Sequence, residues 1–272
     1  MTDAATRCRS FRALHASGCF VMPNPWDRGS ARLLAQLGFP ALATTSAGMA
    51  WSMGRSDNGV QLRDVLEHLR VMAAATDLPL NADFEAGFAV EPDVVASHVA
   101  MAVATGIAGL SIEDSTGDRD HPLFDIRLAT DRIRAAREAI DASGTGALLT
   151  GRSEGFLVGR TDIGETIERL AAYAAAGAEC VYAPRLRTLA EVSAVVKALA
   201  PTPINVLVGS DFATVAELAA AGVRRISTGG ALARAAWTGA MQAARAIAEL
   251  GTFESFSDIV PFAELDGSFA RK

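Results

Sequence analysis

Acidic side chains stand at the ends of two apolar segments of this chain. The segment LPLNADFEAGF, residues 78–88, carries Asp83 and Glu85 at alternate positions, and IAGLSIED, residues 107–114, ends in Glu113 and Asp114. Residues two apart in a strand point to the same side, so Asp83 and Glu85 would crowd together where a buried strand ends. Neighbouring carboxylates repel unless a cation lies between them. Because Mg²⁺ prefers carboxylate and water oxygens, the pattern predicts a magnesium site, with Mn²⁺ as the alternative ion.

The segments that would position these acids alternate between two kinds. Apolar runs predict strands near residues 19–22, 40–45, 78–84, 107–113, 147–151, 179–183, 203–208 and 224–228. Patterns with helical period lie between them, at residues 30–37, 62–75, 94–105, 129–142, 165–176, 189–199 and 214–221. Several joints from helix to strand carry glycine, as in TGIAGL and AGVRRI, which suits a left-handed helix C-cap.

About eight such units in 272 residues predict an α/β fold of the (β/α)₈ TIM-barrel type. We expect a single domain over residues 1–272, with a C-terminal helical tail from about residue 231. The alternative is an open doubly wound sheet, but no G-x-G-x-x-G follows the first strand. An extra helix is expected at 231–250, and the aromatic segment FESFSDIVPFAEL after it is expected to pack on the barrel or on a second subunit.

Composition narrows the class of protein. A net charge of −6 gives no basic surface for nucleic acid. The three cysteines form no metal-type spacing and leave an odd count, which favours a reducing compartment. No apolar run reaches the ~18 residues of a membrane span, and the N-terminus lacks the pattern of a signal peptide. We therefore expect a cytoplasmic protein with neither nucleic acid nor membrane as a partner.

Active sites of such barrels lie at the C-terminal ends of the strands. The second strand leads to Ser46, Ala47 and Gly48, whose backbone N–H groups predict an anion-binding nest. By charge, Mg²⁺ would be held directly or through water by Asp57, Asp83, Glu85 and Glu113. Arg152, after the fifth strand, would take a substrate carboxylate as a bidentate partner. Mg²⁺ chelated by a 2-oxo acid would stabilise a developing enolate.

Simpler interpretations exist for each of these residues. Asp83 and Glu85 could cap a helix or form salt bridges in a turn, and Glu113 could be an ordinary loop acid. Arg152 could form a surface salt bridge, and Ser46 could cap the end of a strand. His121 could serve as an acid or base near neutral pH, or it could be a solvent-exposed loop histidine.

Taken together, the motifs PNPWD, TTSAG…GRSD, NADFEAGF, SIED and GRSEGF resemble those of the isocitrate lyase/phosphoenolpyruvate mutase superfamily. The resemblance runs from about Phe20 to Leu250. It implies an α/β barrel with Mg²⁺ at the strand ends and a last helix exchanged between paired subunits, hence a homodimer or homotetramer. It implies Asp83 as the direct metal ligand and Asp57, Glu85 and Glu113 as water-mediated ones. The implied contacts to the substrate carboxylate are Ser46, Ala47, Gly48, Arg152 and Asn205.

Two features depart from the family pattern. Glu85 stands where the family usually has a second aspartate, although coordination through water tolerates the longer side chain. The loop STGDRDHPLFD, residues 115–125, lacks the K-[KR]-C-G-H segment of the lyases, whose cysteine is the acid/base. It also lacks the lysine and asparagine of the mutases. The chain is therefore similar to a short-loop branch, whose reactions vary.

The sequence thus predicts a Mg²⁺-dependent lyase that breaks a carbon–carbon bond in a small 2-oxo or 2-hydroxy dicarboxylate through an enolate. Its expected catalytic residues are Arg152, Asp57, Glu113 and His121. One alternative is a phosphonopyruvate mutase or hydrolase, and another is an oxaloacetate decarboxylase or hydrolase. A third is a non-catalytic 2-oxo acid binding protein that kept the metal site.

Overall fold

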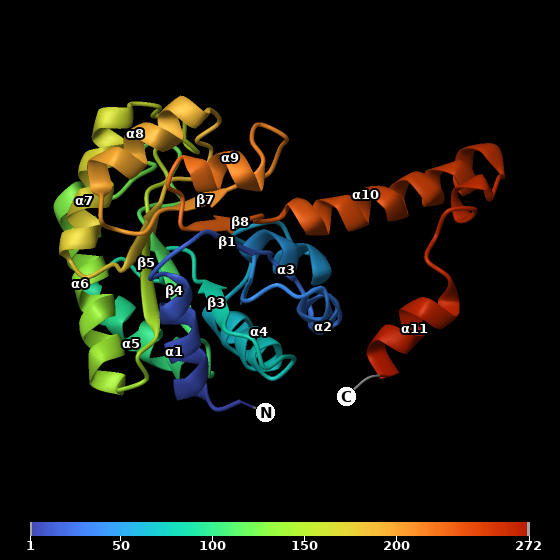
Figure 1. The fold of residues 1–272 in the computed structure, drawn as a ribbon, viewed down its shortest axis with the longest axis horizontal. Coiled ribbons are helices and arrows are strands. Elements are labelled where there is room, and N and C mark those ends of the chain that lie inside the picture. Colours follow the sequence, from blue (N-terminus) through green and yellow to red (C-terminus); the bar gives the residue numbers. More distant parts are fainter. Residues whose placement is uncertain (1, 271–272) are drawn as a thin grey trace.

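The structure, a computed structural model, describes residues 2–270 and contains eight strands that alternate with helices (Figure 1). The strands are β1 (Phe20–Met22), β2 (Leu42–Ala43), β3 (Leu80–Asp83), β4 (Gly109–Glu113), β5 (Leu148–Arg152), β6 (Cys180–Tyr182), β7 (Asn205–Leu207) and β8 (Arg225–Ser227). The helices that alternate with them are α2 (Arg28–Gln36), α4 (Leu62–Ala73), α5 (Pro92–Val103), α6 (Ile126–Ser143), α7 (Ile163–Ala175), α8 (Leu189–Leu199) and α9 (Val215–Ala220). The predicted alternation is confirmed, with shorter strands than the apolar runs suggested.

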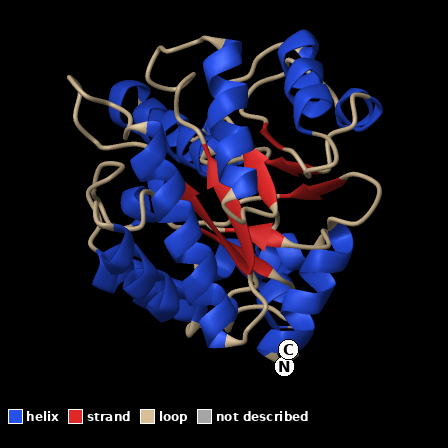
Figure 2. Cartoon of the chain, turned by 90° about the vertical axis from the view of Figure 1, so that its left-hand side faces the viewer, coloured by secondary structure: helices blue, strands red, loops and turns tan. Residues whose placement is uncertain are grey.

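The strands close into a barrel. All ladders are parallel, in the orders β1-β8-β7 and β2-β3-β4-β5-β6. A parallel bridge between Val181 and Ile204 joins β6 to β7, and the Ala43 N–H donates to the Pro23 carbonyl (3.1 Å) at the other seam. Figure 2 shows the strands at the centre with helices around them. The barrel is confirmed and the open-sheet alternative is wrong.

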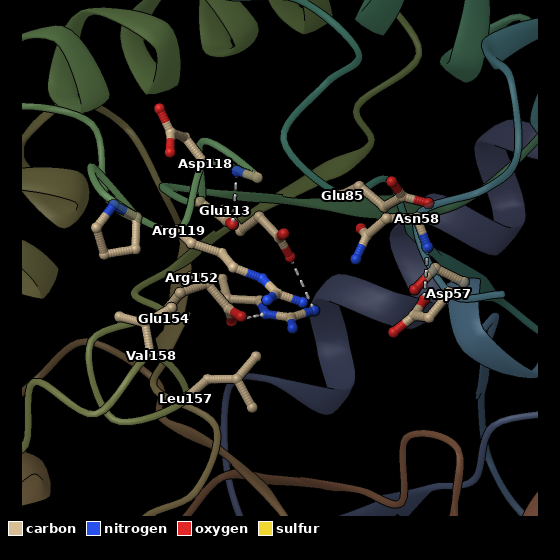
Figure 3. Close-up of a pocket in the computed structure, with 14 residues that line it drawn as sticks. Asp57, Asn58, Glu85, Glu113, Asp118, Arg119, Arg152, Glu154, Leu157 and Val158 are labelled. Atoms are coloured by element: carbon tan, nitrogen blue, oxygen red, sulfur yellow. Dashed lines mark hydrogen bonds and ion pairs between the residues drawn. The ribbon is translucent and has the colours of Figure 1, made fainter.

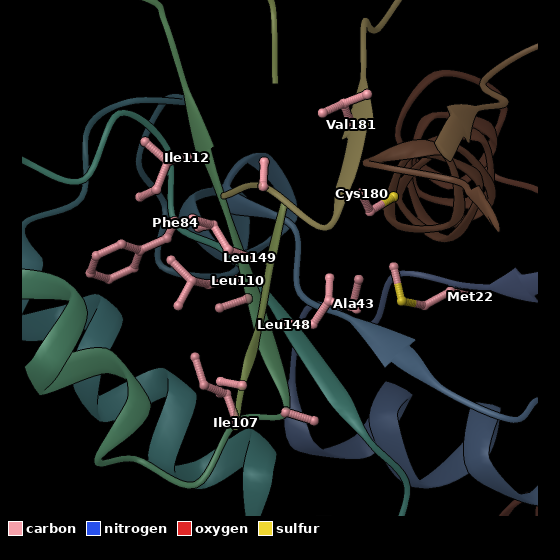
Figure 4. Close-up of a cluster of buried hydrophobic side chains, with 14 of the residues drawn as sticks. Met22, Ala43, Phe84, Ile107, Leu110, Ile112, Leu148, Leu149, Cys180 and Val181 are labelled. Atoms are coloured by element: carbon pink, nitrogen blue, oxygen red, sulfur yellow. The ribbon is translucent and has the colours of Figure 1, made fainter. Parts of the chain in front are cut away.

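The buried core lies inside the barrel and between its strands and helices. Strand residues such as Ala43, Leu110, Leu148 and Cys180 belong to it (Figure 4). The helices bury one apolar stripe each: in α4 the buried residues are Val65, Leu66, Leu69, Met72 and Ala73, which recur at helical spacing. This packing holds the strand ends, and with them the acids, in fixed positions.

Two further helices were not predicted. The first, α1 (Ala4–Leu14), lies at the N-terminal end of the barrel, with Phe11 fully buried. Arg12 of this helix forms an ion pair with Glu179 and donates to the carbonyl of Gly146 (2.8 Å). The second, α3 (Ser46–Ser52), begins directly after β2 at the opposite, C-terminal end.

The C-terminal part of the chain leaves the barrel. Helix α10 (Ala231–Arg245) continues through a π-helical turn (Ala246–Leu250) and projects outward (Figure 1). After a short 3₁₀ helix (Glu254–Phe256), α11 (Phe262–Ala270) returns to α2, where Gln36 donates to the Ser268 carbonyl (2.6 Å). The tail thus returns to the barrel through α11, and most of its large apolar residues are exposed, Phe262 by 83%. Within residues 2–270, no helix has both the length and the apolar character needed to span a membrane.

Candidate active site

A cavity of about 370 Å³ opens at the C-terminal end of the barrel, where the loops after β2, β3, β4 and β5 meet (Figure 3). Four of the predicted residues line it as acids or cation: Asp57, Glu85, Glu113 and Arg152. Asp83 lies just below, in contact with Arg152. The remaining lining residues are Ser46, Asn58, Ser115, Gly117, Asp118, Arg119, Pro122, Glu154, Leu157 and Val158.

Arg152 joins the acids of three strand ends. The β4–β5 register places Glu113 opposite Arg152, and Nη1 of the arginine lies 3.1 Å from Glu113 Oε2 and 3.4 Å from Asp83 Oδ1. Nε of Arg152 donates to Glu154, while Nη2 has no hydrogen-bond partner in residues 2–270. The Arg152 side chain is only 14% exposed, so these are buried ion pairs, not the surface salt bridge that sequence left open. Burial alone would lower the pKa of Arg152, but Glu113 and Glu154 outweigh it and raise that pKa.

The cavity holds more carboxylates than Arg152 can neutralise. Glu85 makes no ion pair in the described part of the chain, and burial together with Asp83 and Asp57 raises its pKa to about 8. Burial and then Asp83 raise the pKa of Asp57 as well. For Glu113, burial raises the pKa, and Arg152 offsets this only in part. Such shifts indicate a site that would gain stability from a further cation.

The donor set fits a hydrated Mg²⁺ ion. Across residues 2–270, no three acidic, histidine or cysteine side chains converge closely enough to enclose a metal ion by themselves. Mg²⁺ does not require this, because it usually keeps several waters and takes one or two protein carboxylates. One direct carboxylate with water-bridged neighbours therefore suits the cavity. Arg152 already neutralises part of the acidic cluster, so the acids depend less on a metal ion than the sequence suggested.

The predicted anion nest has partners within the protein. Ser46 lines the cavity, but its N–H donates to Asp83 Oδ2 (2.9 Å). The Gly48 N–H donates to the Thr45 hydroxyl (3.4 Å), so the cap of α3 occupies it. A Cβ on Gly48 would lie 2.8 Å from the Cβ of Trp26, so close packing requires glycine there. Ala47 is not among the cavity residues. Contact of Ser46, Ala47 or Gly48 with a substrate stays a prediction.

Asn205 and His121 do not line this cavity. Asn205 is buried one layer deeper, where Nδ2 donates to Ser227 Oγ (3.0 Å) and Oδ1 accepts from Arg225 Nε (2.9 Å). It borders a small internal void of about 30 Å³ together with Asp83 and Arg152. His121 is exposed on the loop after β4, with its side chain outside the cavity. The roles predicted for both residues stay predictions.

Sequence reasoning missed Arg119, although it is the only arginine or lysine in the segment 115–125. A bridge between Ser115 and Leu123 folds this loop back on itself, and Arg119 then lines the cavity. The cavity therefore contains a second cation besides Arg152. The sequence shows the positive charge of this loop, but the side of the loop on which Arg119 lies depends on the bridge between Ser115 and Leu123.

Glu113 and Asp114 point to opposite sides of the strand end, as alternation in a strand requires. Asp114 is buried and accepts hydrogen bonds from the Glu154 N–H (2.7 Å), the Tyr173 hydroxyl (2.6 Å) and Arg169 Nη1 (3.2 Å). Arg169 also donates to the Phe124 carbonyl (3.0 Å). Asp114 therefore ties the loops after β4 and β5 to α7 and holds the cavity wall in place.

Comparison with known sequences gives relatives over almost the whole chain. The family profile described as phosphoenolpyruvate phosphomutase matches residues 11–248. A Mycobacterium tuberculosis protein, described as uncharacterized, is 33% identical over 258 residues, 94% of each chain. The 2-methylisocitrate lyase of Escherichia coli is 33% identical over 167 residues, 58% of this chain and 55% of the lyase.

Solved structures agree with this. A Burkholderia cenocepacia J2315 protein, named as a lyase/mutase, superposes with a TM-score of 0.96 and 44% identity, over 98% of this chain and 97% of the other. Oxaloacetate acetylhydrolase in complex with its product oxalate gives a TM-score of 0.86 and 25% identity, over 98% and 95%. Phosphonopyruvate hydrolase in complex with oxalate and Mg²⁺ gives a TM-score of 0.85 and 25% identity, over 99% and 96%.

Proposed function

Because the chain belongs to the phosphoenolpyruvate phosphomutase family of the isocitrate lyase/PEP mutase superfamily, we propose that it is a Mg²⁺-dependent lyase of a small 2-oxo or 2-hydroxy dicarboxylate. The bond broken would be a carbon–carbon bond beside the carbonyl or hydroxyl carbon. One observation carries the proposal: Arg152 lies among Asp83, Glu113 and Glu154 at the floor of a cavity of about 370 Å³. Such a site suits a small dianion and a hydrated cation.

The residues around the cavity divide the work by charge. Asp83, with Asp57, Glu85 and Glu113 through water, would hold Mg²⁺ (or Mn²⁺). When bound, Mg²⁺ would supply positive charge to the oxygen that becomes negative as the bond breaks. Arg152 would bind one substrate carboxylate through its unpartnered Nη2, and Arg119 would bind the second. Since the loop offers no cysteine or lysine, Asp57 and Glu113 are the groups we propose to move a proton at the substrate carbon.

A substrate panel tests this function. The purified protein with 5 mM Mg²⁺ would be offered oxaloacetate and a series of substituted malates and citrates, with release of pyruvate, glyoxylate or oxalate measured. Turnover of at least one compound, abolished by EDTA and restored by Mg²⁺, is the expected result. Binding of Mg²⁺ and a dicarboxylate with no turnover of any compound would instead indicate a non-catalytic binding protein.

Arg119 also favours a second candidate, because a second cation suits the phosphonate group of phosphonopyruvate. The similarity in fold to phosphonopyruvate hydrolase supports including this compound. Phosphorus NMR would detect cleavage or migration of the phosphorus–carbon bond. Phosphonopyruvate could be consumed while oxaloacetate and the substituted malates and citrates all stay unchanged. The protein would then be a phosphonopyruvate hydrolase or mutase and not a carbon–carbon lyase.

We further propose that α10 is exchanged between the subunits of a homodimer or homotetramer. Helix α10 carries Trp237 and Met241, which with Trp51 line an exposed apolar groove, and the tail adds Phe253 and Phe262. A solvent-exposed apolar surface of this kind marks a protein interface. Light scattering should show an oligomer for the native chain and a smaller species for Trp237→Asp. A monomer in both cases would contradict the proposal.

A further inference from the structure

A second cavity, of about 420 Å³, lies beside the ends of β6 and β7 and shares no lining residue with the cavity around Arg152. Three arginines line it: Arg185 after β6, Arg187 two residues later, and Arg234 in the first turn of α10. Ser210 lines it from the loop after β7. Residues far apart in the sequence thus bring three positive charges to one concave surface.

None of these three arginines has an acidic partner. Arg185, Arg187 and Arg234 make no ion pair and no side-chain hydrogen bond within residues 2–270, and no aspartate or glutamate lines the cavity. By contrast, Arg160 forms an ion pair with Glu165 (2.6 Å). Three guanidinium groups around one cavity repel each other, and an anion between them would relieve that repulsion.

The backbone holds the loop that carries two of these arginines in a specific shape. Arg185 has a left-handed backbone, with φ of 69°, a conformation that non-glycine residues adopt at a cost. The N–H groups of Arg187 and Thr188 both donate to Glu191 Oε2 (2.9 and 3.0 Å), which fixes the loop on the start of α8. The loop is thus an ordered wall. Barrels of this fold frequently bind phosphate groups with the loops that follow strands 7 and 8. In this cavity Ser210 lies after β7 and Arg234 lies after β8.

We propose that the cavity lined by Arg185, Arg187 and Arg234 is a second anion site, for a small molecule with a phosphate or polycarboxylate group of at least two negative charges. The site goes beyond the proposed lyase function, because it requires neither the acids nor Arg152. Guanidinium groups bind both kinds of oxyanion through paired N–H donors. The Ser210 hydroxyl, which has no partner in the described residues, adds a further donor.

Calorimetric titration at constant ionic strength tests the proposal with inorganic phosphate, pyrophosphate and citrate as probes. The native protein should bind at least one of them. Arg185→Gln and Arg234→Gln should each weaken that binding about tenfold or more, as loss of one charged hydrogen-bonding partner does. Arg127→Gln is the matched control, because Arg127 is an exposed arginine that lines none of the described cavities. It should change binding less than twofold, and circular dichroism should show the native fold in all variants.

A fourth variant separates this site from the proposed active site. Asp83→Asn should bind the probe as tightly as the native protein, because Asp83 does not line the arginine cavity. Binding of phosphate or pyrophosphate but not citrate would assign a phosphate-bearing ligand, and the reverse a polycarboxylate. The proposal is overturned if no probe binds at millimolar concentration, if Arg127→Gln weakens binding as much as Arg185→Gln, or if Asp83→Asn abolishes it.

Discussion

At the mouth of the barrel, Arg152 neutralises neighbouring acids, and we propose that one of its terminal nitrogens also binds a ligand. Its Nη1 and Nε face Asp83, Glu113 and Glu154, and its Nη2 has no hydrogen-bond partner in residues 2–270. Burial raises the pKa of both Glu113 and Glu154, which shows how unfavourable their charges are without a cation. Arg152 therefore contributes to the stability of the folded protein even when no substrate is bound.

Arg152→Gln should leave these carboxylates without a counter-charge. We expect a loss of about 3–5 kcal/mol in the free energy of unfolding, the usual cost of breaking a buried ion pair from one side. Mg²⁺ should stabilise this variant more than the native protein, since a bound cation would replace the lost charge. Urea unfolding with and without Mg²⁺ measures both effects. Arg160→Gln, which removes an exposed ion pair, is the control and should cost less than about 1 kcal/mol. An equal cost for the two variants would contradict the prediction.

Asp83 is the residue on which the proposed metal site depends most. Asp83→Ala, and the closer isostere Asp83→Asn, should weaken Mg²⁺ binding by about a hundredfold or more while the barrel stays folded. The fold should survive because Arg152 keeps Glu113 and Glu154 as partners and the cluster loses one of its repelling charges. Calorimetry measures binding and thermal unfolding measures the fold, with Asp118→Asn, at the cavity edge, as control. Unfolding of Asp83→Asn, or unchanged affinity, would point to a structural role for Asp83.

At the scale of elements, the cavity wall depends on contacts between loops that follow different strands. Asp114 receives hydrogen bonds from Glu154 in the loop after β5 and from Arg169 and Tyr173 of α7. Its own carbonyl accepts the N–H of Phe124, in the segment that carries Arg119 (2.9 Å). One buried carboxylate thus keeps the two loops in register with each other.

Asp114→Asn should loosen both loops without removing any cavity residue. We expect a loss of about 1–3 kcal/mol of stability and faster amide exchange in residues 115–125 and 153–160. Tyr173→Phe, which removes one of the three hydrogen bonds, should cost about 1 kcal/mol and affect exchange less. Hydrogen exchange followed by mass spectrometry measures the exchange rates of these two loops in each variant. Exchange that rises uniformly over the whole barrel would show that Asp114 supports global stability and not these loops.

At the scale of the whole molecule, α1 covers the N-terminal end of the barrel. A chain of hydrogen bonds runs from His15, at the end of this helix, to residues inside the barrel. Nδ1 of His15, just after α1, donates to the Phe11 carbonyl (2.7 Å), and its Nε2 accepts from Arg225 Nη1 (3.3 Å). Arg225 also donates to Asn205 and Thr150. Burial, and then the charge of Arg225, lowers the pKa of His15 to about 3. His15 is therefore neutral in the folded protein at any pH where the barrel is normally studied.

The contribution of His15 to the stability of the barrel should decrease on mild acidification, whereas Glu85, whose pKa is raised to about 8, acts in the opposite direction. Below about pH 6.5 the unfolded chain binds a proton at His15 that the folded chain excludes until about pH 3, so the stabilising contribution of His15 is full above pH 6.5 and decreases below it. Between pH 7 and pH 5 the contribution of His15 is up to about 2 kcal/mol. In urea unfolding, the stability of His15→Gln relative to the native protein should therefore rise from pH 7 to pH 5, and His121→Gln, which changes an exposed loop histidine, is the control. Parallel slopes for all three proteins would contradict the prediction.

The periodicity of apolar residues in the sequence was sufficient to predict the barrel. Each βα unit must bury the apolar side chains of its strand and one apolar face of its helix, and both patterns are visible in the sequence. It failed for α1 and α3: α1 buries only Cys8 and Phe11 against the end of the barrel, and α3 is a single short helix at its mouth. Neither segment has a long apolar stripe of its own. Their helical state depends on caps and on contacts that only the closed barrel provides.

The sequence by itself determined that acids and Arg152 stand at neighbouring strand ends, since position along a strand follows from apolar patterning. Only the tertiary structure decided which charges meet. Arg152 neutralises Glu113 and Asp83, Asp114 turns away from the cavity, Arg119 turns toward it, and Arg185, Arg187 and Arg234 converge. Electrostatic energy depends on distance and burial, and both are set by strand register and loop conformation rather than by spacing along the chain.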